Sequence, residues 1–235
     1  LNPNVKMKDS GVEWIRELPE NWLKKSIKHM LLLEKGSIKT GPFGSQLTNQ
    51  DMEGSDVKVY NQRNVLDNDF SKGEYYISEE KFQSLQSFET FPGDILITTR
   101  GTIGRVAISP DGIERGILHP CLIRIQVNEN IILPEYLKYV FNNTDLIKEQ
   151  VFLLSNATTI EVIYSETLKN IVVTFPNNIE EQKEIVTYLD NQTAIFNSCI
   201  DEITQQIEKL KEYRQSLIYE LVTGKIDVRD IEINS

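Results

Sequence analysis

The sequence contains few of the residues from which catalytic and metal sites are usually built. Its 235 residues include only two histidines, His29 and His119, and two cysteines, Cys121 and Cys199. Two histidines give little material for a histidine metal site or a histidine-based catalytic triad. The cysteines are far apart and have neither metal-binding nor redox-active spacing, so we expect reduced thiols. The sequence therefore predicts no metal site and no cofactor.

Signatures of membrane insertion and export are missing as well. The chain has no apolar run of about eighteen residues, the length that suggests a membrane-spanning helix. It does not open with a charged segment followed by an apolar stretch, as a secretory leader does. Together with the reduced thiols, these features predict a cytoplasmic protein with no membrane partner.

Motifs that would assign a catalytic reaction were sought and are mostly absent. Residues 36–41 read Gly-Ser-Ile-Lys-Thr-Gly but lack the Lys-Ser or Lys-Thr of a Walker-type phosphate loop. Pro110, Asp111, Glu114 and Arg115 only faintly resemble nuclease carboxylate spacing, and a Ser-Pro-Asp-Gly turn explains them better. The Asn-Pro-Pro-aromatic motif with which amino-methyltransferases hold an extruded base is absent. We expect a non-catalytic chain, with an unrecognised carboxylate enzyme as the weakest alternative.

The net charge of −10 argues against tight, stand-alone binding to nucleic acid. This charge is unevenly distributed. From Ile179 onward there are 12 acidic and 6 basic residues, whereas residues 1–178 contain 23 acidic and 19 basic residues. The larger part of the chain is therefore only mildly acidic, and local basic clusters can still form a DNA-facing stripe there.

A heptad pattern runs through the last quarter of the chain, from Ile179 to Thr223. Apolar residues spaced alternately three and four apart form a narrow seam on one helix face, which is typical of a coiled coil. At ~1.5 Å per residue the helix would be roughly 65 Å long, which indicates a spacer. Polar residues at two seam positions, Thr193 and Arg214, would fix the register. The apolar seam consists of Val186, Leu189, Phe196, Ile200, Ile203, Ile207, Leu210, Leu217 and Leu221.

Residues 1–178 read as an α+β domain with a mixed sheet. Short runs rich in Ile, Val, Thr and Tyr, bounded by Gly, Pro or Asn, predict strands. These runs are Val57–Tyr60, Asp94–Thr98, Ile103–Ile108, Ile117–Val127 and Asn170–Phe175. Helices are expected at Glu79–Phe88 and at Pro134–Phe141, the latter with proline at a favourable first helical position.

Local signals mark the ends of the long helix and the packing of several aromatic residues. Asn178 can cap the helix, with two glutamates complementing its positive end, and Thr223-Gly224 can stop it. Trp14 and Trp22 are expected to pack the start of the chain onto the core. Phe43, between a Gly-Pro and a Gly-Ser turn, is expected to be buried, with outward-pointing backbone amides around it.

Polar and basic residues gather at several expected turns. Amides and guanidinium groups have the donor and acceptor geometry to read base edges in the major groove, and glycines allow close backbone approach. For the turn at 98–105, local sequence alone favours an ordinary hairpin with solvated arginines over a DNA contact. The candidate contact residues are Lys39, Thr40, Ser45, Gln46, Asn61, Gln62, Arg63, Asn64, Thr99, Arg100, Thr102 and Arg105.

Short motifs over nearly the whole chain resemble the specificity subunit of type I restriction-modification systems. Their order and spacing carry the resemblance, since each motif is short. The motifs are KDSGVEWI at 8–15, LPENW at 18–22, GPFGS at 41–45, GDIL at 93–96, RGTIG at 100–104, IEEQKEI at 179–185, LI at 217–218 and TGKIDVR at 223–229.

This resemblance implies a function for each part of the chain. Residues 1–178 would form a target-recognition domain that binds double-stranded DNA and reads one half of a split site. Residues 179–223 would form the spacer helix, and residues 224–235 a tail. Methylation and cleavage would belong to the modification (methyltransferase) and restriction subunits, and the modification subunits could supply much of the phosphate contact.

The chain departs from the usual specificity subunit, which carries two recognition domains and two spacer helices. Two copies that pair antiparallel through their seams would restore that layout, and a two-fold dimer is the commonest symmetric solution. Alternatively, the chain is one half of a longer protein or pairs with a separate second half. A rival interpretation from another class is a coiled-coil adaptor whose body binds protein and reads no DNA.

Overall fold

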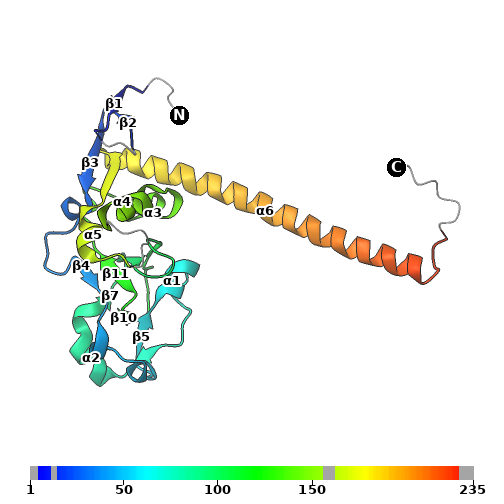
Figure 1. Cartoon of the computed structure of the whole chain (residues 1–235), viewed down its shortest axis with the longest axis horizontal. Coiled ribbons are helices and arrows are strands. Elements are labelled where there is room, and N and C mark those ends of the chain that lie inside the picture. The colour runs from blue at the N-terminus through cyan, green and yellow to red at the C-terminus, as the bar shows by residue number, and fades with distance from the viewer. Residues whose placement is uncertain (1–4, 12–14, 156–161, 228–235) are drawn as a thin grey trace. The chain divides into compact units, whose positions relative to one another are not determined.

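The structure is a computed structural model that describes residues 5–11, 15–155 and 162–227. The chain divides into two compact units, residues 1–186 and residues 187–235. The first unit, called the body here, contains the strands and short helices, whereas the second contains most of one long helix (Figure 1). The expected α+β fold with a mixed sheet and a long C-terminal helix is confirmed.

Two four-stranded sheets form the frame of the body. The first is antiparallel, in the order β4 (Ile38–Thr40), β11 (Leu122–Ile125), β8 (Ile95–Thr98), β9 (Val106–Ile108). The second contains one parallel pair, β5 with β10, in the order β6 (Tyr76–Ile77), β5 (Val57–Tyr60), β10 (Gly116–Leu118), β7 (Glu89–Thr90). Two antiparallel pairs join β12 (Val172–Pro176) to β3 (Trp22–Ser26) and β1 (Met7–Asp9) to β2 (Glu17–Pro19).

Helices connect and cover these strands. The α-helices are α1 (Gln62–Asp67), α2 (Glu79–Leu85), α3 (Pro134–Asn143), α4 (Leu146–Ser155), α5 (Ser165–Asn170) and α6 (Ile179–Val222). Single turns of 3₁₀ helix lie at Ile27–His29, Gly44–Gln46, Gln50–Met52 and Gln86–Phe88. Within the described residues, no helix is long and apolar enough to cross a membrane.

The body is held together by apolar side chains on both faces of β8. Successive strand residues point to opposite faces, so Ile95 and Ile97 lie in one core cluster and Leu96 lies in another. The first cluster packs the sheet against α3, α4 and β12, whereas the second joins it to Tyr60 and Leu118 of the other sheet. A strand buried on both faces needs a continuous apolar run, which is why the sequence here reads Ile-Leu-Ile.

One strand expectation was wrong in a way that matters for the site. The run Ile117–Val127 was expected to be a single strand, but it forms β10 and β11, which belong to different sheets. The turn at 119–121 separates them, and the Leu122 N–H donates to the His119 carbonyl across it at 3.0 Å. Pro120 has no N–H to donate to a sheet ladder, so the chain leaves one sheet and enters the other there.

Several other expectations are confirmed or corrected. Ile103 lies in the turn before β9, so that strand starts later than expected. Phe43 was expected to be buried, but it is 50% exposed. Trp22 does pack onto the core, with its ring edge-on to Tyr136 at 6.4 Å between centroids. Trp14 lies outside the described residues.

The first two turns of α6 belong to the body. Asn178 caps the helix, because its Oδ1 accepts the Glu180 N–H at 3.0 Å. The Gln182 side chain is fully buried, and its amide accepts from the Leu133 N–H and donates to the carbonyls of Ile131 and Pro176, all at 2.9 to 3.0 Å. A buried amide with three backbone partners is costly to loosen, so this contact fixes the start of the helix.

Glu181 and Val186 reinforce the same attachment. One Glu181 oxygen accepts from the Trp22 indole N–H at 3.0 Å, and the other accepts from Asn21 at 3.1 Å. Val186 is only 9% exposed and packs in the main core cluster. Its assignment to the partner-facing seam is therefore corrected, since it is already covered by the body.

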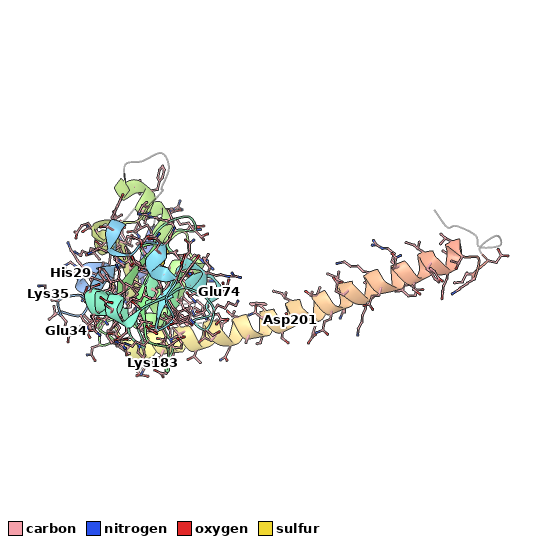
Figure 2. The ribbon with its side chains drawn as sticks, turned by 90° about the horizontal axis from the view of Figure 1, so that it is seen from below. His29, Glu34, Lys35, Glu74, Lys183 and Asp201 are labelled. Carbon is pink, nitrogen blue, oxygen red and sulfur yellow. The ribbon has the colours of Figure 1, made fainter. Side chains whose placement is uncertain are left out.

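Beyond Val186 the seam is largely open. Phe196, Ile200, Ile203, Ile207, Leu210 and Leu217 are between 37% and 66% exposed, while Leu189 and Leu221 are partly buried. Figure 2 shows side chains projecting outward from this part of the helix around Asp201. These side chains form an apolar stripe, interrupted by Arg214, that the described residues leave uncovered.

We expect Gln182→Ala to lower the free energy of unfolding by about 3 kcal/mol, because it leaves three buried backbone groups without their partner. Urea denaturation followed by tryptophan fluorescence measures the change. Gln205→Ala, an exposed glutamine of the same helix, is the matched control and should change stability by less than about 0.5 kcal/mol. Equal effects of the two variants would contradict a fixed helix start.

Candidate nucleic-acid interface

The strand order brings most of the predicted contact residues to one edge of the body. The parallel strands β5 and β10 end side by side, with Leu118 opposite Tyr60. In the other sheet the end of β8 pairs with the start of β11, with Thr98 opposite Leu122. The segments after β4, β5, β8 and β10 therefore leave from the same edge. We call residues 40–46, 61–63, 99–105 and 119–121 the turn face.

Backbone contacts hold the segments of the turn face together. The His119 N–H donates to the Tyr60 carbonyl at 2.8 Å, and the Thr99 N–H donates to the Cys121 carbonyl at 2.9 Å. The turn 119–121 thus connects the segment after β5 with the segment after β8. Gly41 lies so close to this turn that a Cβ there would sit 2.2 Å from the His119 oxygen, so only glycine fits.

A groove of about 770 Å³ opens in the turn face. Its walls come from the start of α1, the loop before β6 and the turn 119–121, so segments distant in sequence enclose it. The lining residues are Asn61, Gln62, Arg63, Lys72, Gly73, Glu74, Tyr75, His119 and Cys121. Predicted contact residues supply one wall. His119 and Cys121 supply another wall that the sequence interpretation missed, because it placed them inside a strand.

Two smaller cavities lie near the arginine-containing loop. One of about 100 Å³ is lined by Thr40, Phe43, Thr99 and Arg100 together with residues of the segment before α5. The other, about 400 Å³, is lined by Thr102 and Arg105 and by apolar residues of α3 and α4. The predicted residues at 99–105 therefore face two different hollows.

The three candidate arginines differ in how strongly they are held. Arg63 is 77% exposed and has only a 3.6 Å ion pair with Asp67, which contributes little at the surface. Arg105 is exposed and donates to the Asn142 carbonyl at 3.0 Å. Arg100 is exposed and makes no ion pair within the described residues. All three side chains are exposed, and Arg105 is held more firmly than Arg63, because its charged guanidinium donates a hydrogen bond of ordinary length.

Two predicted contact residues are buried, and we remove them from the interface. Asn64 is 1% exposed, and its amide holds the Asn61 N–H and the carbonyls of Asp69 and Lys72. Thr99 is 2% exposed, and its hydroxyl donates to the Cys121 carbonyl. The hydrogen bonds of both side chains stabilise the turn face, so neither side chain is available to contact a base.

Other predicted residues are accessible but partly engaged. The Asn61 side chain caps α1 by accepting the Arg63 N–H at 2.8 Å. The Gln46 side chain accepts the Phe43 N–H at 3.1 Å, so that amide does not point freely outward. The Lys39 ammonium lies 4.4 Å from the centre of the Phe88 ring. Thr40 is partly buried, whereas Ser45 and Thr102 are exposed.

Two titratable residues of the groove, His119 and Cys121, are shifted toward their neutral forms, whereas a hydrogen bond to Asp67 raises the pKa of Lys72 and favours its charged form. Burial, reinforced by the nearby Arg100 charge, lowers the pKa of His119 below its ordinary value. Burial likewise raises the pKa of the Cys121 thiol. Both effects arise because a low-dielectric site disfavours the charged form. Among the described residues, no group of three or more His, Cys, Asp or Glu side chains is arranged to hold a metal ion.

Comparison with known proteins connects the chain to type I restriction-modification systems. The family model of the type I restriction modification DNA specificity domain matches residues 19–209. A Haemophilus influenzae protein described as a candidate type I restriction enzyme specificity subunit is 29% identical over 177 residues, covering 73% of this chain and 43% of that protein. The MjaIX specificity subunit of Methanocaldococcus jannaschii is 26% identical over 213 residues, covering 88% and 44%.

Solved structures share the fold. A chain from a structure on complex assembly and conformational transition of the type I R-M system aligns with a TM-score of 0.64 and 17% identity, covering 91% of this chain and 48% of that chain. The HsdS subunit from Thermoanaerobacter tengcongensis aligns with a TM-score of 0.57 and 16% identity, covering 94% and 48%. The chain thus spans less than half the length of these relatives.

If the turn face contacts DNA, alanine at Arg63, Arg100 or Arg105 should weaken binding in one of two ways. Loss of a base contact should cost ~1–3 kcal/mol and relax the preference at one base pair, whereas loss of a phosphate contact should weaken all sequences alike. Competition binding by the chain assembled with modification subunits measures both. Arg115→Ala, at the opposite end of β10, is the control and should leave affinity unchanged. Unchanged affinity in all three variants would place the DNA on another face.

Proposed function

The chain belongs to the type I restriction modification DNA specificity domain family, and from this premise we propose that its body reads one half of a split DNA target. Residues 1–178 act as the target-recognition domain, the helix from 179 to 223 acts as the spacer, and residues 224–235 form a tail. The chain itself is non-catalytic, and it positions modification and restriction subunits that carry out methylation and cleavage.

The turn face is the observation that best supports DNA reading by the body. It gathers amides, one arginine and a histidine around a groove of about 770 Å³, and these groups have the hydrogen-bonding geometry that base edges require. Exposed Arg63 and Arg100 supply mobile positive charge at the same edge. An enzyme site would instead need an activated nucleophile or base. The close titratable pair in the groove, His119 Nδ1 and the Cys121 sulfur at 2.9 Å, does not supply one, because burial raises the pKa of the thiol and keeps it protonated.

The acidic balance of the chain fits a division of labour among subunits. With a net charge of −10, the chain is poorly suited to neutralising many phosphates by itself. Modification subunits would supply much of that contact and enclose the duplex, while the turn face selects the sequence. Positive surface is then needed only locally, where the base contacts are made.

The open stripe on α6 supports pairing with a second helix. A stripe of side chains up to 66% exposed on one helix face is an association surface rather than a solvated one. In this proposal a second copy, or a second specificity half, packs antiparallel on the stripe and restores two recognition domains. Further apolar residues beside the stripe, including Ile195, Tyr213 and Ile218, leave room for contact with modification subunits as well.

The rival function is a coiled-coil adaptor that reads no DNA. It would also use the open stripe, but it would need no base-reading groups. The purified chain, tested against random duplexes with and without modification subunits, separates the two. We expect sequence-selective binding that becomes tight when the modification subunits are present. Enrichment of no sequence by the assembled complex would favour the adaptor.

We expect the chain to self-associate through the stripe, and Ile203→Asp with Leu210→Asp to give monomers, because each buried carboxylate would face an apolar partner. Sedimentation velocity at tens of micromolar measures the state. Ser198→Asp with Gln205→Asp adds the same charge at heptad position f, opposite the seam, and should leave the dimer intact. A wild-type chain that is already monomeric under these conditions contradicts the homodimer and favours a separate second half.

A further inference from the structure

His119 lies in the wall of the groove, and one of its ring nitrogens, Nδ1, is hydrogen-bonded within the protein. The backbone N–H of Cys121 donates to His119 Nδ1 at 3.2 Å. The Cys121 sulfur lies 2.9 Å from the same nitrogen. No other hydrogen bond to the ring comes from the described residues, so Nε2 is left without a protein partner there.

These contacts decide which nitrogen carries the proton. A backbone N–H can only donate, so Nδ1 must be the unprotonated acceptor of a neutral ring. Burial holds the pKa of His119 low, which keeps the ring neutral near pH 7. Burial also keeps Cys121 protonated, so its S–H can serve as a second donor to Nδ1. Both donors favour the tautomer that has its hydrogen on Nε2.

We propose that His119 is a specificity-determining residue that presents a fixed Nε2–H donor to a base edge in the major groove. This proposal rests on the proposed function and deepens it, since it names a residue and the base chemistry that it selects. The Cys121 backbone N–H holds Nδ1 as an acceptor, so in this ring orientation Nε2 carries the hydrogen and can only donate. Fixed donors of this kind discriminate better than amides, which can present either end.

The chemistry of base edges then restricts the base opposite His119. Guanine offers O6 and N7, adenine N7, and thymine O4 as acceptors in the major groove, whereas cytosine offers only its amino donor. A fixed donor is therefore compatible with the first three and repels cytosine. The neighbouring Gln62 and Arg63 line the same groove and can supply the further contacts that choose among the remaining bases.

The alternative is that His119 only shapes the turn. Its Nδ1 contacts with Cys121 would serve that purpose equally well, and they explain the position of the ring without DNA. The two roles differ at Nε2. A base-reading histidine contacts a base through Nε2, whereas a purely structural histidine has no effect on which base is preferred in the target. Sequence preference, measured at each position of the target, therefore distinguishes them.

The first test is the tautomer, which needs no DNA. The chain has only two histidines, so two-bond ¹H–¹⁵N correlation spectra of the ¹⁵N-labelled protein resolve both rings, and His29→Ala assigns them. We expect the pattern of a neutral His119 ring protonated on Nε2. A ring protonated on Nδ1 at pH 7 would overturn the proposal, whatever the protein binds.

The second test is target selection from randomised duplexes by the chain assembled with its modification subunits. We expect wild type to exclude cytosine at one position, His119→Ala to relax that position roughly three- to tenfold, and His119→Gln to admit cytosine, because a rotated amide can accept its amino group. All other positions should keep their preference. His29→Ala is the control, since Figure 2 shows His29 and the groove residue Glu74 on opposite sides of the body.

The outcomes distinguish failure of the proposed role of His119 from failure of the proposed function, which is DNA reading by the body. If wild type selects a sequence but neither His119 variant changes any single position, His119 is structural and the proposed function stands. If the variants weaken all sequences equally, His119 contacts phosphate or supports the fold, and the proposal is likewise overturned. If wild type selects no sequence, the proposed function fails and this inference fails with it. Melting temperatures of both variants identify any loss of folding.

Discussion

The attachment of the long helix to the body depends on the buried amide of Gln182. That side chain satisfies backbone groups from the loop before α3 and from the end of β12. Its own donors and acceptor are satisfied in return, which makes the contact stable rather than costly. With Glu181 held by Trp22 and Val186 in the core, the helix begins inside the body. The first two turns of α6 are therefore part of the body.

The second constraint is the edge where both sheets end. One parallel pair and one antiparallel pair meet there through the turn 119–121, so segments far apart in sequence become neighbours. The buried polar side chains of Asn64 and Thr99 stabilise this arrangement through hydrogen bonds to backbone carbonyls. The exposed arginines and the groove then lie on segments that are hydrogen-bonded to one another, as the proposed recognition of base edges needs.

Much of this architecture could be predicted from sequence. The composition of the runs Val57–Tyr60 and Asp94–Thr98 predicts strands, and the heptad periodicity predicts the long helix. The site was predicted less well, for physical reasons. The apolar run Ile117–Val127 looks continuous, and only tertiary pairing shows that Pro120 divides it between two sheets. Burial of Asn64 and exposure of Phe43 also depend on distant neighbours that local sequence does not reveal.

The central claim is the proposal that the turn face of the body selects the DNA sequence. A structure of the assembled complex on its DNA target tests this claim most directly. The account predicts the turn face in a groove of the duplex, with Arg63, Arg100 and His119 nearest the base edges. A complex in which another surface of the body contacts the DNA, with the turn face open to solvent, would contradict it.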